Sequence, residues 1–139
     1  MEFFLFLNPD TQELINQISK AKYTVMENNG ICYHSFVTGF VKVPEKSFTI
    51  CTDNIKKSFR DVELNINRVV THESMHVAQM CNDNRPLGIP KSEISKENHD
   101  NILRSIEVGN NINYEIEYEA YLMENNPKEV IHYIRRYCF

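Results

Sequence analysis

The sequence predicts a single α+β domain in which a first helix is followed by a small sheet and then by further helices. The chain has 139 residues, of which 42% are hydrophobic and 11% aromatic, and this length suffices for one buried core but not for two. β-Branched and aromatic residues are concentrated in residues 23–54, whereas apolar residues recur at helical spacing on either side. We therefore expect one domain over residues 1–139, with a mainly antiparallel sheet packed on a long helix.

The N-terminal segment is predicted to be an apolar terminus followed by a helix. The apolar run that starts the chain is broken after Leu7 and has no positive segment before it, so it is too short for a membrane span or a signal-peptide core. It is expected to form a buried strand or an anchored terminus. Asn8 suits a helix N-cap and Pro9 suits the first helical position, so a helix of roughly three turns should follow.

Short strands are expected between the first helix and the long one. Residues 31–37, 39–43 and 47–52 are rich in β-branched and aromatic side chains. Asparagine, glycine and proline residues separate these runs, as is typical of turns. The three runs are predicted to be the strands of the antiparallel sheet.

The remainder of the chain is predicted to be mostly helical. Ser58 and Asp61, three residues apart, resemble an acidic version of a capping box, and the long helix that follows should end near Asn82, where turn-forming residues begin. Residues 86–97 are expected to form a loop. Three more helices are expected: one ending near Gly109, one over 112–123, and one that opens at Asn126-Pro127.

Charge patterning argues against nucleic-acid binding. Charged residues make up 24% of the chain, the net charge is only −4, and no long block of one sign is present. No stretch is long and apolar enough to predict membrane insertion. The sequence says nothing about oligomeric state.

The four cysteines are predicted to be reduced and mostly buried. Cys32, Cys51, Cys81 and Cys138 lack the Cys-x-x-Cys spacing of cysteine-based zinc sites. Their even number would permit two disulfides in an exporting cell, but no export signal is recognised in the sequence. Free thiols and a cytoplasmic location are therefore expected.

A candidate metal site is formed by His72, Glu73 and His76 in the run THESMHVAQM. Residues four apart lie one turn apart on the same helix face, so the two imidazoles can bind one tetrahedral zinc ion. Glu73 lies roughly 100° around the same turn, which suits a base that acts on a water rather than a metal ligand. Zinc would lower the pKa of that water toward about 7, and Glu73 would take its proton and later pass it to the leaving amine.

The flanks of this motif favour a functional site over two ordinary packed histidines. Residues 69–71 before it and Ser74, Met75, Val77 and Ala78 within and after it are uncharged, so the motif lies on the buried face of a well-capped helix. An accidental match would more often carry charges at these places or fall in a loop. The remaining histidines do not stand at the spacing of a third-histidine site.

A catalytic zinc site needs a third protein ligand, and the acidic segment after Gly109 is the expected donor. Glu115, Glu117 and Glu119 are the candidates there. Glu115 and Glu119 share a helix face, whereas Glu117 lies with Ala120 and Tyr121. At least one or two of the three should simply form a solvated acidic face.

Residues 69–77 resemble the extended motif of zincin metallopeptidases with a glutamate third ligand, the gluzincins, and residues 117–120 resemble their Glu-x-x-Ala segment. Residues 47–54 resemble the edge strand before the active-site helix in compact members, such as mitochondrial inner-membrane peptidases. The resemblance covers about a third of the chain. It implies a zincin-like fold, a zinc cofactor, Glu117 as third ligand with Glu119 in reserve, and an extended peptide or protein substrate bound along 47–52 by β-augmentation.

One departure concerns the group that orients a ligand histidine. Many relatives place an aspartate four residues after the third ligand, and this chain has Tyr121 there, so that either its hydroxyl substitutes or Glu117 is misassigned. Gln79, on the face of His72, is either a second such group or an ordinary polar helix residue. A hydrogen-bond donor for the transition-state oxyanion is expected from this set: Tyr114, Tyr118, Tyr121, Tyr133, Tyr137 and His34.

The sequence thus favours a zinc-dependent metallohydrolase, with peptidase the first choice, in which His72, His76 and Glu117 bind Zn²⁺ and Glu73 is the general base. A zincin-like binding module that no longer catalyses is the alternative, although the intact Glu73 disfavours it. In a third hypothesis the domain binds no metal and both histidines only pack.

Overall fold

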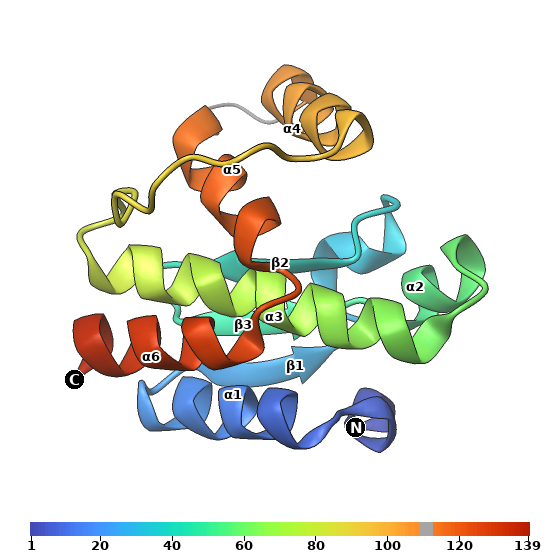
Figure 1. Cartoon of the computed structure of the whole chain (residues 1–139). Coiled ribbons are helices and arrows are strands. Elements are labelled where there is room, and N and C mark those ends of the chain that lie inside the picture. The colour runs from blue at the N-terminus through green and yellow to red at the C-terminus, as the bar shows by residue number, and fades with distance from the viewer. Residues whose placement is uncertain (109–112) are drawn as a thin grey trace.

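In the computed structural model, which describes residues 1–108 and 113–139, a three-stranded sheet and a layer of helices pack on the long central helix α3 (Figure 1). The described order confirms an α+β chain that runs from a helix through a sheet to further helices. The elements are η1 (Glu2–Phe6), α1 (Pro9–Lys20), β1 (Thr24–Glu27), η2 (Gly30–Tyr33), β2 (Gly39–Lys42), β3 (Ser47–Ile50), α2 (Thr52–Ser58), α3 (Val62–Cys81), α4 (Lys96–Val108), α5 (Tyr114–Met123) and α6 (Pro127–Cys138).

The N-terminal run is an anchored terminus rather than a strand. It forms the 3₁₀ helix η1, whose Phe3 is fully buried. The backbone N–H groups of Glu2 and Phe3 donate to the Glu27 carboxylate at 2.9 and 2.8 Å, which ties the terminus to the end of β1. The predicted cap of α1 is confirmed, because the Asn8 side chain accepts from the Thr11 N–H at 3.0 Å.

The sheet is mixed, so the prediction of a mainly antiparallel sheet is wrong. Its strand order is β1-β3-β2, with β1 parallel to β3 and β2 antiparallel to it. The predicted strands at 39–43 and 47–52 are present as β2 and β3, but β1 was not expected. Because β3 has a partner on both sides, it is the central strand and not the edge strand that the sequence predicted.

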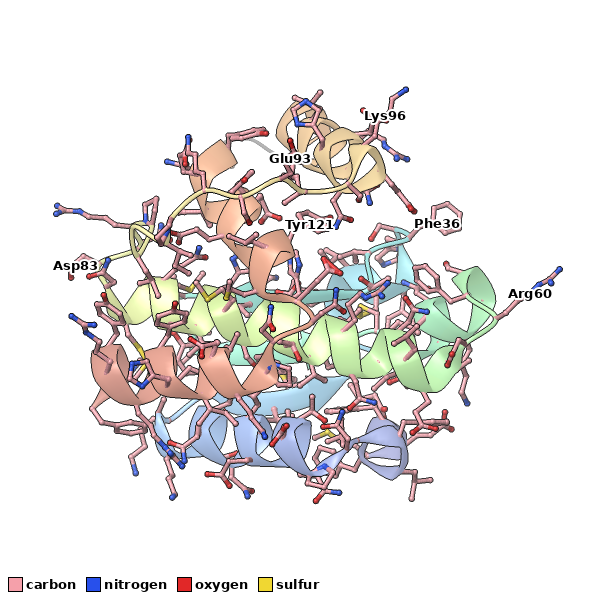
Figure 2. The ribbon with its side chains drawn as sticks, in the orientation of Figure 1. Phe36, Arg60, Asp83, Glu93, Lys96 and Tyr121 are labelled. Carbon is pink, nitrogen blue, oxygen red and sulfur yellow. A yellow bond between two sulfur atoms is a disulfide. The ribbon has the colours of Figure 1, made fainter. Side chains whose placement is uncertain are left out.

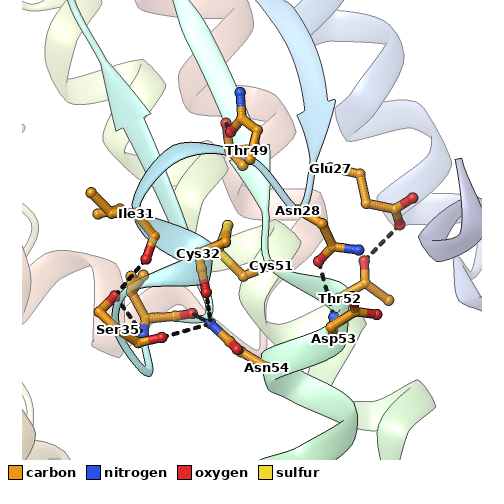
Figure 3. Close-up of a disulfide and its surroundings, with 12 residues drawn as sticks. Glu27, Asn28, Ile31, Cys32, Ser35, Thr49, Cys51, Thr52, Asp53 and Asn54 are labelled. Carbon is orange, nitrogen blue, oxygen red and sulfur yellow. Dashed lines mark hydrogen bonds between the residues drawn. A yellow bond between two sulfur atoms is a disulfide. The ribbon is translucent and has the colours of Figure 1, made fainter.

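The strand predicted at 31–37 is also wrong. Residues 30–33 form the 3₁₀ helix η2, and the chain then runs irregularly to β2. One buried side-chain amide replaces a strand partner here: Asn54 Nδ2 donates to the carbonyls of Cys32, Ser35 and Val37 at 2.9–3.0 Å (Figure 3). A β-prone composition therefore did not decide this backbone, because three of its carbonyls accept from a side chain of α2 rather than from a neighbouring strand.

The prediction of free thiols is wrong as well, since all four cysteines are paired. Cys32 in η2 is bonded to Cys51, which follows β3 (Figure 3). Cys81 at the end of α3 is bonded to Cys138 at the end of α6. One disulfide holds the segment that leads into β2, and the other joins the C-terminal ends of two packed helices.

The long helix ends where the sequence predicted, but it begins with a different cap. Ser58 closes the short helix α2, which was not expected, and Asp61 caps α3 alone by accepting from the Leu64 N–H at 3.0 Å. The loop before α4 and the helices α4, α5 and α6 confirm the remaining predictions. The start predicted at Ile112 lies outside the described residues, and α5 is described from Tyr114.

Helix α3 occupies the centre of the fold. It contacts α1, α5 and α6 as well as β2 and β3, and its buried residues Ile66, Val70 and Met75 belong to the main apolar core. The buried face of α6 is the predicted one, with Val130, Ile131 and Ile134 inward. Among the described residues, no helix combines the length and apolarity that a membrane crossing requires.

Both disulfides can be checked by counting thiols. We expect no free thiol in the protein denatured without reductant and four after reduction. Closing loops of 19 and 57 residues in sequence separation restricts the unfolded chain, so reduction should lower the free energy of unfolding by roughly 3–4 kcal/mol for each bond. Thiol titration and urea unfolding with and without reductant measure the two effects, and four free thiols before reduction would contradict the pairing.

Candidate metal centre

Three side chains of α3 converge as its helical spacing predicts. One ligand atom each from His72, Glu73 and His76 lie within 4.8 Å of one another. The two imidazole rings pack edge to face with centroids 5.1 Å apart. A single helix turn thus presents two nitrogen ligands and one carboxylate to the same place.

Helix α5 adds Glu117 to this group. Its Oε1 lies 3.1 Å from His76 Nε2 and its Oε2 lies 3.6 Å from His72 Nε2. Two atoms that bind one zinc ion at about 2.05 Å in tetrahedral geometry are about 3.3 Å apart, so these separations fit a shared metal ion. Glu117 is therefore the glutamate that the structure brings to both histidines.

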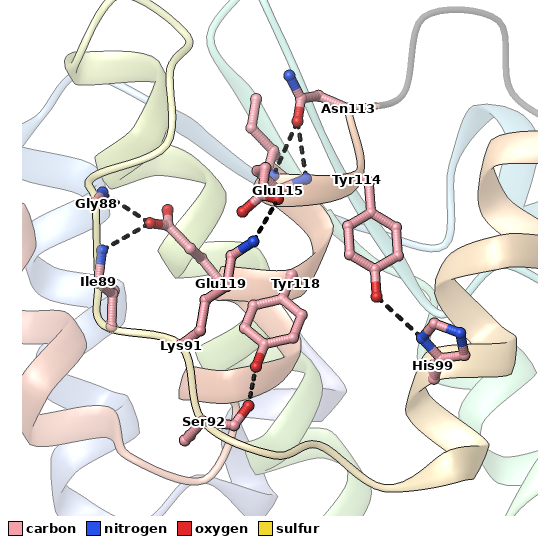
Figure 4. Close-up of polar contacts among 11 residues, drawn as sticks. Gly88, Ile89, Lys91, Ser92, His99, Asn113, Tyr114, Glu115, Tyr118 and Glu119 are labelled. Atoms are coloured by element: carbon pink, nitrogen blue, oxygen red, sulfur yellow. Dashed lines mark hydrogen bonds and ion pairs between the residues drawn. The ribbon is translucent and has the colours of Figure 1, made fainter.

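The other two candidate glutamates have different partners. The Glu119 carboxylate is buried and accepts from the backbone N–H groups of Leu87, Gly88 and Ile89 at 2.9–3.0 Å, and Glu115 pairs with Lys91 (Figure 4). Neither contacts His72 or His76. Glu115 provides the exposed acidic face that the sequence led us to expect, whereas Glu119 fixes a loop.

The far side of the His76 ring contacts Gln79. His76 Nδ1 lies 2.9 Å from Gln79 Oε1, so Gln79 contacts one of the two candidate ligand histidines. With Nδ1 directed at Gln79, the nitrogen that faces Glu117 is Nε2. An outer partner of this kind fixes the orientation of a metal-binding ring.

The far side of the His72 ring faces a carboxylate that sequence reasoning missed. His72 Nδ1 lies 3.8 Å from Glu124 Oε1, and Arg68 Nε lies 3.4 Å from Glu124 Oε2. Glu124 Oε1 is buried without a hydrogen-bond partner in the described part of the chain, so it can accept a hydrogen from this ring. Its spacing could have identified it, because Glu124 stands seven residues, or two helical turns, after Glu117. The sequence-based prediction considered only the position four residues after Glu117.

Tyr121 contacts the same histidine through its ring rather than replacing the missing aspartate. Its ring packs edge to face on His72 with centroids 4.5 Å apart. Two other tyrosines expected as candidate donors are engaged elsewhere: the Tyr114 hydroxyl lies 2.9 Å from His99 Nδ1, and the Tyr118 hydroxyl donates to the Ser92 carbonyl (Figure 4). Figure 2 shows Tyr121 on the last turns of α5, above α3.

Burial and nearby charge shift the pKa values of the group together. Burial alone would lower the pKa of His72, but the carboxylates of Glu117 and Glu124 outweigh it and raise that pKa to about 10. The pKa of His76 also rises, because Glu117 outweighs the effect of burial. The pKa of Glu117 falls well below its usual range since both histidines stabilise the carboxylate against its burial. The charged forms of these imidazoles and of the Glu117 carboxylate thus stabilise one another.

Glu73 lies between this group and the sheet. Burial raises the pKa of its carboxyl, in part against the charges of His76 and His72. The backbone of β2 approaches closely: a Cβ on Gly39 would lie 3.0 Å from Glu73 Cγ and 2.9 Å from Val69 Cγ1. A glycine at this position therefore lets the edge strand run beside the Glu73 side chain.

The fold and the site together define an α+β protein with a candidate centre for one metal ion, built from two imidazoles and one carboxylate. The chain belongs to the family described as Domain of unknown function (DUF8637), which matches residues 3–139. Comparisons with curated proteins and with solved structures give no match.

The raised pKa of His72 predicts how the metal-free protein responds to pH. The charged ring contributes stability in full below its ordinary pKa of about 6.5, and this contribution is lost as the pH rises toward the folded value of about 10. Thermal melts in a chelator should therefore show stability falling between these values, less steeply in His72→Gln. Equal slopes in the two proteins would contradict the His72–Glu117–Glu124 interaction.

Proposed function

We propose that the protein is a zinc-dependent metallohydrolase of the gluzincin kind, with peptidase its activity. The observation that carries the proposal is the convergence of His72 Nε2 and His76 Nε2 on the Glu117 carboxylate, at spacings that suit one tetrahedral ion. Two neutral imidazoles and a carboxylate leave a fourth position free, as catalytic zinc sites require.

The zinc ion and the protein side chains would have different roles in the proposed reaction. A bound zinc ion supplies a Lewis acid that polarises a carbonyl and lowers the pKa of a water. Glu73, which offers a carboxylate oxygen within 4.8 Å of a nitrogen of His72 and of His76 and whose pKa is raised by burial, is the proposed acceptor of a proton from that water. The same carboxyl then donates the proton to the leaving amine. The Tyr121 hydroxyl is the proposed donor to the developing oxyanion, since this ring contacts His72.

The proposed substrate is an extended peptide or protein segment that pairs with β2. The sequence assigned this role to residues 47–52, but β3 has no free edge because β1 and β2 flank it. β2 is one of the two edge strands, it lies on the α5 side of the sheet (Figure 1), and its Gly39 approaches Glu73. A strand added to β2 would therefore pass next to the proposed base.

The proposed location differs from the cytoplasmic one that the sequence favoured. That expectation depended on reduced thiols, and all four cysteines are paired. Disulfides persist mainly in oxidising environments, so we propose that the protein acts in an oxidising compartment. Its partner there would be the peptide or protein substrate.

Zinc content and one base substitution test the proposal. Wild type should bind about one zinc per chain, measured by plasma mass spectrometry after offering zinc at neutral pH. His72→Ala and Glu117→Ala should lose zinc or bind it far more weakly, whereas Glu115→Ala, on the exposed face of the same helix, should bind as wild type does. Zinc retained in full by both site variants would end the proposal.

Glu73→Gln separates the enzyme from a zincin-like binding module. This variant should keep its zinc and lose at least about 10²-fold in the rate at which zinc-loaded protein cleaves a mixture of quenched fluorescent peptides. A zinc-loaded wild type that cleaves no faster than Glu73→Gln would support the binding module instead.

A further inference from the structure

The orientation of the Gln79 amide is fixed by what surrounds it. Gln79 is fully buried, and its Nε2 donates to the Ile116 carbonyl at 3.0 Å and to Glu119 Oε1 at 2.9 Å. Both partners only accept hydrogen bonds, so the nitrogen must face them and the oxygen must face His76. Because an amide oxygen cannot donate, His76 Nδ1 carries the hydrogen of the 2.9 Å contact. Its Nε2 is then the nitrogen that offers a lone pair when the ring is neutral.

Glu119 links this amide to a distant piece of backbone. Its two carboxylate oxygens accept four hydrogen bonds: one from Gln79 and three from the N–H groups of Leu87, Gly88 and Ile89. Figure 4 shows the carboxylate directed from α5 at the chain that crosses it. A buried carboxylate with this set of donors is fully satisfied, which leaves it no role as a metal ligand.

We propose that Gln79 and Glu119 form a positioning relay, through which the backbone of residues 87–89 holds His76 with Nε2 toward the metal. The inference rests on the proposed function in one respect, that His76 binds metal. If Glu119 served only to hold the loop, its hydrogen bonds with the three N–H groups would be sufficient. The additional link from Gln79 to His76 connects the loop to the metal centre.

The relay has a thermodynamic consequence that works in both directions. If an ordered 87–89 segment strengthens zinc binding, then zinc must stabilise that segment by the same factor. Amide hydrogen exchange can report on this segment by itself, because Pro86 and Pro90 have no backbone N–H. The amide hydrogens between these two prolines are therefore those of the three residues that donate to Glu119.

The experiment combines hydrogen exchange with zinc titration. In wild type, saturating Zn²⁺ should slow amide exchange over residues 87–89. Gln79→Leu should weaken zinc binding by about 10- to 100-fold, measured by competition with a chelator at neutral pH, and should remove the zinc effect on exchange. Glu129→Gln, an exposed carboxylate in the first turn of α6, is the control and should change neither quantity.

Each outcome decides the proposal. Wild-type zinc affinity in Gln79→Leu, or exchange over 87–89 that is the same with and without zinc in wild type, would overturn the relay while the proposed function stands. The wild-type exchange comparison needs no variant, so it decides even where Gln79→Leu does not fold. Failure of wild type to bind zinc would overturn both proposals.

Discussion

The side chains of His72, His76 and Glu117 are only 12–15% exposed. An unpaired charge that is buried to this degree is costly, so the charged form of each side chain depends on the opposite charge beside it. Their mutual contacts fix α5 against α3. That packing in turn places Glu124 at His72 and Gln79 beside Glu119, so each histidine has an outer partner as well as an inner one. The position of α5 on α3 therefore depends on this cluster of charges.

Around this cluster, the rest of the chain fixes what can reach Glu73. The sheet packs on α3, and one of its edge strands, β2, runs beside Glu73 only because Gly39 has no side chain. The segment that leads into β2 is held by the Cys32–Cys51 disulfide and by three hydrogen bonds from Asn54. Glu119 on α5 holds the segment that follows α3, because its carboxylate accepts from the backbone N–H groups of residues 87–89. Rigid supports on both sides are what a preorganised site requires.

The parts of the site and fold that depend on local spacing were predictable from the sequence. The i, i+4 pair of His72 and His76 and the inward face of α6 follow from helical periodicity, the Asn8 cap follows from residue preference, and all three are present. Features that depend on contacts between distant segments were missed. The pairing of Cys81 with Cys138 and the parallel partner of β3 each join residues whose proximity no local pattern encodes. Glu124 was also missed, although its spacing of two helical turns from Glu117 places it on the same side of α5. Composition predicted strand at 31–37, where Asn54 imposes another backbone.

The central claim is that His72, His76 and Glu117 bind one metal ion, and a crystal structure of the zinc-loaded protein with anomalous scattering at the zinc edge tests it most directly. We expect a single strong anomalous peak at about 2.0–2.2 Å from both Nε2 atoms and from the Glu117 carboxylate, with the Nδ1 atoms still facing Gln79 and Glu124. A zinc-loaded crystal without a peak at this position, or with its zinc held by other residues, would contradict this assignment of the ligands.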